Sequence, residues 1–234
     1  MTAERTRVLV IAAHPDDELL GCGGTVARHT RAGACVTSVI VCEGESLRYG
    51  PGGVGQRSHV DSAARVLGVE DVRLLAFPDQ RLDTFTLTDV IGALERIVGE
   101  VQPQVVYGQY GGDVNRDHQL VFQAMLVATR PTERSIESVY AFDTASSTEW
   151  AYPRTFVPDT WVDVGDTLAT KLQAMACYES ELRDYPHPRS LEALEYRARA
   201  WGAQACLSAA EVFMTVRRVF RDDARAGAAR WPGD

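Results

Sequence analysis

The sequence has no stretch that approaches the roughly 18 consecutive apolar residues of a membrane-spanning helix, so we expect no membrane insertion. Its arginines are scattered and the net charge is −8, which gives no basic surface for a nucleic-acid backbone. The five cysteines are odd in number and form no CxxC pair, so neither a disulfide framework nor a thiolate zinc site is indicated. With the polar start MTAERTR giving no export signal, these absences favour a globular cytoplasmic protein without a nucleic-acid partner.

Several catalytic signatures are also missing. No GxSxG or thiol-nucleophile motif is present, so covalent catalysis has no support. The glycines of GCGG, residues 21–24, lack the spacing of a dinucleotide-binding fingerprint, and no nucleotide cofactor is expected. No linker, repeat or low-complexity segment divides the chain, so we expect one domain over residues 1–234 with a flexible tail from about 221.

What is present is an alternation of short, valine-rich apolar runs with segments of helical length. The first four runs cover 8–13, 35–42, 72–77 and 105–110. The alternation predicts βαβ units, and nearly all-apolar strands are typical of a parallel sheet covered by helices on both faces. Later in the chain we expect a strand at 161–164, helices at 166–178 and 191–201, and a last strand from 211.

Polar clusters follow two of these runs. AHPDDE, residues 13–18, places an imidazole and three carboxylates after the first run, and GGDVNRDHQL, residues 111–120, follows the fourth. Because the carboxyl ends of parallel strands lie at one edge of a sheet, the two clusters should meet on a solvent-facing rim. Neighbouring anions repel one another, so a bound cation is expected there.

The residue types indicate which cation. His14 and Asp17 can converge on one ion, and His118 is the best remaining donor. Two histidines with one carboxylate favour zinc over magnesium or calcium, although iron(II) also fits. With Asp16 beside a metal-bound water as general base, the site would be a metal-assisted hydrolase. The alternative is that these acids only cap a helix, and Asp117 either orients a ligand histidine or caps the helix that begins there.

Two segments are expected to be loops. Residues 43–56 carry five glycines and should form a mobile wall of the same cleft. The peptide ELRDYPHPRS, residues 181–190, contains two prolines and connects two predicted helices. The sequence does not determine where His187 of this loop lies, and its side chain could reach the cleft.

AHPDDE followed by GCGG resembles the signature of the LmbE-like (PIG-L) de-N-acetylases, which include the deacetylase of N-acetylglucosaminyl-phosphatidylinositol and those of mycothiol and bacillithiol precursors. The resemblance continues in RSHVDSAARVLGV from Arg57, FPDQRLD from Phe77, NRDH at 115–118 and AEVFMTVR from Ala210. It implies an α/β fold, a Rossmann-like three-layer sandwich with a mostly parallel sheet. It also implies a zinc-dependent hydrolase that removes the N-acetyl group of an amino sugar or amino-sugar conjugate. By this resemblance zinc is held by His14, Asp17 and His118, and Asp16 is the general base.

One position departs from the family. Many members carry HPDH where this chain has NRDH, so Asn115 replaces a histidine that helps to stabilise the oxyanion. An amide can donate a hydrogen bond to an oxyanion but cannot transfer a proton. Arg116 replaces a proline and suits either an anionic substrate group or plain solvent exposure. Substrate contacts are expected from Glu45, Arg57, Asp79 and Arg116.

Two other classes of function stay open. A non-catalytic carbohydrate-binding protein of this fold would need the carboxylates but not the water-activating geometry. A metal-dependent hydrolase could instead cleave a phosphoester, a non-sugar amide or an ester, although phosphoryl chemistry commonly uses two metals and the sequence offers obvious ligands for one. The sugar, the aglycone and the acyl chain are not determined, and a homo-oligomer is compatible with the sequence.

Overall fold

The computed structural model describes residues 5–49 and 55–221, which build a seven-stranded sheet in the order β3-β2-β1-β4-β5-β7-β6. Strands β1 to β5 are parallel, whereas β7 runs antiparallel to both of its neighbours, β5 and β6. The mostly parallel sheet predicted from the alternation is therefore confirmed. The strands are β1 (Arg7–Ala12), β2 (Cys35–Cys42), β3 (Asp71–Phe77), β4 (Val105–Gln109), β5 (Ser138–Phe142), β6 (Thr160–Asp163) and β7 (Ala210–Arg218).

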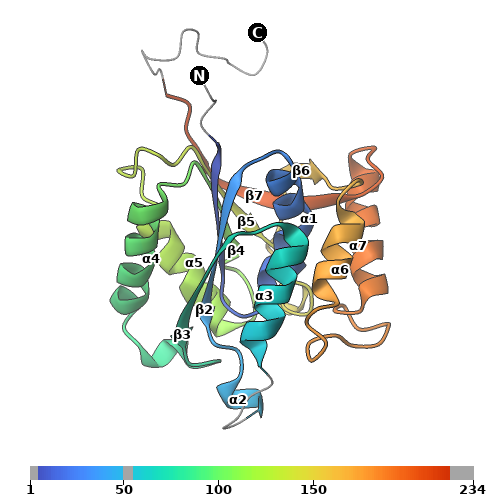
Figure 1. Ribbon diagram of the computed structural model, residues 1–234, viewed down its shortest axis with the longest axis horizontal. Coiled ribbons are helices and arrows are strands. Elements are labelled where there is room, and N and C mark those ends of the chain that lie inside the picture. The colour runs from blue at the N-terminus through green and yellow to red at the C-terminus, as the bar shows by residue number, and fades with distance from the viewer. Residues whose placement is uncertain (1–4, 50–54, 222–234) are drawn as a thin grey trace.

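Helices cover both faces of the sheet (Figure 1). Helices α4 and α5 lie on one face, and α1, α3, α6 and α7 lie on the other, which makes three layers. The helices are α1 (Asp17–Arg31), α2 (Ser46–Tyr49), α3 (Gln56–Leu67), α4 (Leu87–Val101), α5 (Arg116–Ala128), α6 (Leu168–Met175) and α7 (Leu191–Gln204), with short 3-10 turns at Leu82–Thr84 and Thr148–Trp150. Within the described residues, none of these helices is both long and apolar enough to cross a membrane.

The central strand β1 is apolar from Val8 to Ala12 because both of its faces are buried. In β1, Val8 and Val10 belong to the core under α1, α3 and α6, while Leu9 and Ile11 belong to the core under α4 and α5. Successive strand residues point to opposite faces, so a strand covered on both sides favours apolar residues at successive positions. The charged AHPDDE and GGDVNRDHQL segments lie beyond the ends of β1 and β4.

The glycine-rich GCGG segment lies inside helix α1. Gly21 has no room for a side chain, since a Cβ there would stand 2.0 Å from Cδ2 of Phe142 in β5. Cys22 leaves the helical conformation, and Glu211 of β7 accepts hydrogen bonds from the backbone N–H groups of Gly24 and Thr25 at 2.9 and 2.6 Å. These glycines let α1 approach the sheet closely and so position its first residue, Asp17.

Two details differ from expectation, and one prediction is not tested. Strand β5, with the sequence SVYAF, was not predicted. The segment 43–56 is not loop throughout, since it contains α2 and the first residue of α3, and residues 50–54 lie outside the described part. The predicted tail beyond 221 also lies outside the described residues.

Candidate metal centre

Three donor atoms from distant parts of the chain form a small triangle. Nδ1 of His14, in the loop after β1, lies 3.2 Å from Oδ2 of Asp17 and 3.3 Å from Nε2 of His118. The third side, between Oδ2 of Asp17 and Nε2 of His118, is 3.4 Å. A tetrahedral zinc ion with ligands at about 2.0–2.1 Å needs ligand atoms about 3.3–3.4 Å apart, so the triangle has the dimensions of such a site.

These residues are more buried than the sequence suggested. His14, Asp17 and His118 are 6%, 4% and 2% exposed, and Asp16 is 3% exposed, so the cluster does not lie on a solvent-facing rim. The two clusters do meet, but the expectation that they face solvent was wrong because residues that follow the sheet edge, especially those after β5 and between α6 and α7, cover them. Burial strengthens every electrostatic interaction among these groups.

Each imidazole is oriented by a carboxylate on its other nitrogen. Nε2 of His14 lies 3.1 Å from Oδ2 of Asp117, and Nδ1 of His118 lies 3.2 Å from Oδ1 of Asp113. This leaves Nδ1 of His14 and Nε2 of His118 for an ion, and such outer carboxylates commonly fix the tautomer of a ligand histidine. Asp113 was not singled out from the sequence, although it lies in the same GGDVNRDHQL segment, four residues after β4 ends.

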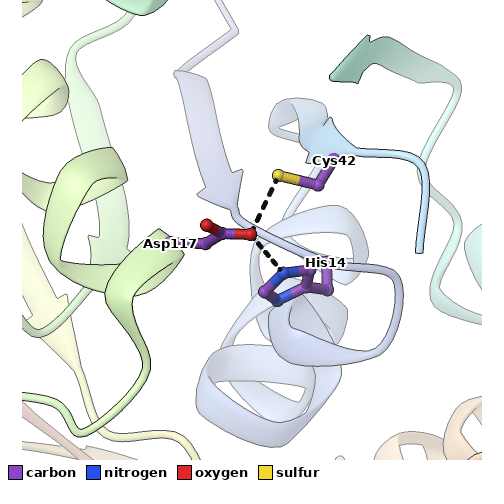
Figure 2. Close-up of side chains that lie close together, drawn as sticks. All are labelled: His14, Cys42 and Asp117. Carbon is purple, nitrogen blue, oxygen red and sulfur yellow. Dashed lines mark hydrogen bonds and ion pairs between the residues drawn. The ribbon is translucent and has the colours of Figure 1, made fainter. Parts of the chain in front are cut away.

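A second group of donors surrounds the same histidine. Figure 2 shows Cys42, from the end of β2, and His14 both directed at the carboxylate of Asp117. The thiol of Cys42 donates to Oδ2 of Asp117 at 3.6 Å, and burial raises the pKa of this thiol to about 11, so it stays neutral. Oδ1 of Asp117 accepts from the backbone N–H of Leu82 at 3.1 Å. Asp117 is thus held from two sides as the partner of His14.

The charges of the triangle depend on one another. Burial disfavours a charged imidazole, but the carboxylate of Asp17 and contact with Asp113 raise the pKa of His118 to about 9. Burial opposes ionisation of Asp17 as well, yet the charges and hydrogen bonds of His118 and His14 lower its pKa below its usual range. Without a cation, protons on the imidazoles balance these acids, and a divalent ion would displace those protons.

Asp16 stands beside the triangle in a strained backbone conformation. Its φ of 97° lies in the left-handed region, and its side chain caps no N–H of α1 although it precedes that helix. For a non-glycine residue such a conformation costs about 1–3 kcal/mol and often marks a functional position. Burial and the charge of Asp17 raise the pKa of Asp16 well above its usual value, and Arg189 opposes that shift.

A cavity of about 150 Å³ opens onto these groups. His14, Asp16, Asp17, Asn115 and His118 line it together with residues from the later chain, among them Ser147, Trp150, Glu181, His187 and Arg189. His187 therefore does reach the cleft, and its ring packs edge-to-face on Trp150 with the centroids 6.3 Å apart. Glu181 and Arg189 carry no motif that would have identified them, because they lie more than 160 residues after AHPDDE.

The amide of Asn115 has two partners. Its Oδ1 accepts from the backbone N–H of Asp117 at 2.9 Å, which caps α5, and its Nδ2 donates to Oε1 of Gln80 at 3.3 Å. The second N–H of Nδ2 remains for another acceptor in the cavity. Asp79, also a lining residue, is buried with Oδ1 3.4 Å from Nε2 of His14.

The other three residues expected to contact substrate are not among those that line the cavity. Arg116 is exposed and donates to the side chain of its helix neighbour Gln119. Arg57 is exposed and paired with Asp61 at 2.9 Å. The carboxylate of Glu45 accepts from the first backbone N–H of α3.

Comparison with known proteins identifies a family and several similar deacetylases. The model of the family PIG-L, described as GlcNAc-PI de-N-acetylase, matches residues 9–129. The "Uncharacterized deacetylase YaiS" of Escherichia coli K12 is 33% identical over 185 residues, which are 76% of this chain and 92% of YaiS. The 1D-myo-inositol 2-acetamido-2-deoxy-alpha-D-glucopyranoside deacetylase of Streptomyces avermitilis is 31% identical over 185 residues, 64% of this chain and 60% of that longer enzyme.

Solved structures share the fold at lower identity. The N,N'-diacetylchitobiose deacetylase of Pyrococcus horikoshii is 20% identical with a TM-score of 0.71, covering 91% of this chain and 84% of that chain. GalB, the 4-carboxy-2-hydroxymuconate hydratase of Pseudomonas putida KT2440, is 23% identical with a TM-score of 0.72, covering 94% and 100%. A deacetylase and a hydratase thus share this architecture, so the fold by itself does not determine the reaction.

The family assignment rests on sequence, and the structure places the motif residues of that match around one centre. The matched residues 9–129 contain AHPDDE and NRDH, the two segments that supply the triangle of His14, Asp17 and His118. The resemblance stated from these motifs is confirmed: the chain belongs to the PIG-L family, the family of the GlcNAc-PI de-N-acetylase.

Proposed function

We propose that this protein is a metal-dependent hydrolase that removes the N-acetyl group from an amino sugar or an amino-sugar conjugate. The observation that carries the proposal is the buried triangle of two imidazole nitrogens and one carboxylate oxygen with sides of 3.2–3.4 Å, beside Asp16 in the same cavity. Membership of the PIG-L family and the names of its relatives supply the substrate class.

His14, Asp17 and His118 would hold the ion, and their chemistry suits zinc, with iron(II) as the alternative. Such an ion lowers the pKa of bound water towards about 7 and polarises a carbonyl oxygen. Asp113 and Asp117 keep the two imidazoles in the orientation that directs a nitrogen at the ion position. Asp17 remains a carboxylate there because the two histidines lower its pKa.

Asp16 is assigned the proton transfers. Its carboxylate can accept the proton of the attacking water and pass it to the nitrogen of the departing amine, so one group serves both steps. Burial and the neighbouring Asp17 raise its pKa well above the usual value, which makes it a stronger base than an exposed aspartate. Asn115 is assigned a hydrogen bond to the oxyanion through the N–H that Gln80 does not take.

The five cysteines are free, which supports a reducing compartment such as the cytoplasm.

The experiment that tests the function is a metal analysis followed by a screen. Zinc-loaded protein is incubated with N-acetylated amino-sugar conjugates, including N,N'-diacetylchitobiose and N-acetylglucosaminyl-inositol, and released amine and acetate are measured. Acetamides that carry no sugar serve as the comparison set.

We expect about one equivalent of metal per chain, equimolar amine and acetate from at least one sugar conjugate, and reversible loss of activity on chelation. Release from non-sugar acetamides alone would identify a hydrolase of another amide. A purified protein that binds no metal and releases no amine would contradict the proposal and favour a non-catalytic binding protein.

A further inference from the structure

A chain of polar contacts runs from the segment between α6 and α7 to Asp16. Nη1 of Arg189 lies 3.3 Å from Oδ2 of Asp16 and 2.9 Å from Oε2 of Glu181. The side chain of Arg189 is 14% exposed, and that of Glu181 is 2% exposed, so both contacts are shielded from solvent. A guanidinium that bridges two buried carboxylates has a restricted position.

Arg189 is itself fixed by its surroundings. Oε1 of Glu181 accepts from Nε2 of Gln56, the first residue of α3, at 3.0 Å. The backbone N–H of Arg189 donates to Nδ1 of His187 at 3.1 Å, and the next residue, Ser190, caps α7 by accepting from the N–H of Ala193 at 3.0 Å. The guanidinium is therefore anchored to two helices that flank the cavity.

Asp16 needs such an anchor more than most carboxylates do. Its backbone is strained, it makes no capping bond, and the negative charge of Asp17 follows directly in the chain. A charge-assisted hydrogen bond from a guanidinium restricts the position of a carboxylate. Arg189 is the cation that contacts it among the described residues.

We propose that Arg189 is a positioning residue that holds the Asp16 carboxylate in line for proton transfer at the metal centre. The inference rests on the proposed function in one respect only, the role of Asp16 as base. Arg189, Glu181 and His187 all lie outside residues 9–129, so the family match says nothing of them. The segment between α6 and α7 then completes an active site whose candidate ligands all lie between residues 14 and 118.

The contact is tested without any substrate by a double-mutant cycle on the zinc-loaded protein. Urea midpoints are measured for Arg189→Ala, Asp16→Asn and the double variant. If the pair interacts as the structure shows, the midpoint of the double variant falls by less than the sum of the two single shifts. Arg189→Ala and the double variant both lose the contact between Arg189 and Glu181, so that loss cancels from the coupling energy between Arg189 and Asp16.

The matched control is an arginine–carboxylate pair on the surface. Arg199 and Glu195 lie 2.8 Å apart on α7 with side chains 56% and 37% exposed, so their own cycle, with Arg199→Ala and Glu195→Gln, should be nearly additive. A coupling between Arg189 and Asp16 no larger than that of the surface pair overturns the proposal.

Catalysis provides the second readout. We expect Arg189→Ala to keep its zinc and its KM within about threefold but to lose about 10- to 100-fold in kcat, the usual effect of a misplaced catalytic group. Arg189→Lys should retain more of kcat, and added guanidinium ion should restore part of it in Arg189→Ala. Arg199→Ala should behave as the unaltered protein.

Unchanged kcat in Arg189→Ala, or a loss that neither lysine nor guanidinium reduces, contradicts the positioning role. If the unaltered, zinc-loaded protein releases no amine from any conjugate, the proposed function fails instead. The urea cycle still decides in that case whether Arg189 holds Asp16.

Discussion

Removal of the metal should make the stability of this protein depend on pH in a way that the metal-loaded form does not share. The cause is His118, whose pKa in the metal-free fold is raised to about 9 from an ordinary 6.5. Burial works against this shift, but the carboxylates of Asp17 and Asp113 outweigh it. The metal-free fold therefore binds a proton at His118 more tightly than the unfolded chain does.

The size of the effect follows from the size of the shift. A difference of about 2.5 pKa units at about 1.4 kcal/mol per unit gives about 3 kcal/mol of stability from protonated His118 as an upper value. Because the pKa is raised on folding, this contribution is fully present below about pH 6.5 and is lost as the pH rises through about 9. His14, whose pKa is also raised, acts in the same direction.

The assay is urea denaturation of chelator-treated protein at several pH values between about 6.5 and 9. His118→Gln is the matched variant, because it keeps a polar side chain of similar reach but cannot take up the proton. Its free energy of unfolding should fall less steeply with pH, and the difference between the two curves isolates His118. Zinc-loaded protein should show no such decline, since a metal-bound imidazole carries no proton to lose.

A free energy of unfolding that is flat with pH in the metal-free protein, or that declines equally in His118→Gln, would refute this reasoning. It would mean that the acids around the triangle are not balanced by histidine protons. Proton release on zinc binding is a second check, because an ion that displaces those protons should liberate at least one near neutral pH.

The remaining predictions concern single side chains of the centre. Asp16→Asn should keep its zinc but lose about 10²- to 10⁴-fold in kcat, whereas Asp17→Asn should lose zinc affinity, and elemental analysis with kcat distinguishes the two; the reverse pattern would exchange their roles. Asp113→Asn should weaken zinc binding about 10- to 100-fold, measured by competition with a chelator, because the ring of His118 loses its orienting carboxylate; an unchanged affinity would show that the contact is incidental. Asn115→Ala should lower kcat by up to about 10²- to 10³-fold and also lower stability by about 1 kcal/mol through loss of the α5 cap. Asn115→Asp keeps the cap acceptor but loses the N–H donor, so an aspartate variant with unaltered kcat would reduce Asn115 to a capping residue.

The parallel sheet and the meeting of the two polar clusters were both predictable because each leaves a local mark in the sequence. A strand covered on both faces is apolar at most positions, and the carboxyl ends of parallel strands meet at one edge. From these two regularities we predicted that AHPDDE and NRDH meet in space, although they are about 100 residues apart in the sequence. Strand β5 was not predicted, although it is as long as β4, which was.

The groups around the candidate ligands were harder to predict. The role of Asp113 could have been predicted, since it is a carboxylate near the end of β4 in GGDVNRDHQL, the segment that also contains His118. Asp117 was expected either to orient a ligand histidine or to cap α5, and only its contact with Nε2 of His14 shows which histidine it faces. Which carboxylate contacts which imidazole ring depends on the directions of the side chains, and the spacing of residues in the sequence does not determine these directions.

By itself, the sequence determined the sheet, the family and the residue types of the centre, because hydrophobic periodicity and short polar motifs are local properties of the chain. Only the tertiary structure decided how deeply the centre is buried and what completes it. Arg189 and Glu181 reach Asp16 through the packing of the α6–α7 segment over the sheet edge, whereas Arg57 and Arg116 remain outside the cavity. Such contacts arise between elements with no fixed separation in sequence. The sequence therefore shows which side chains are charged but not which groups they contact.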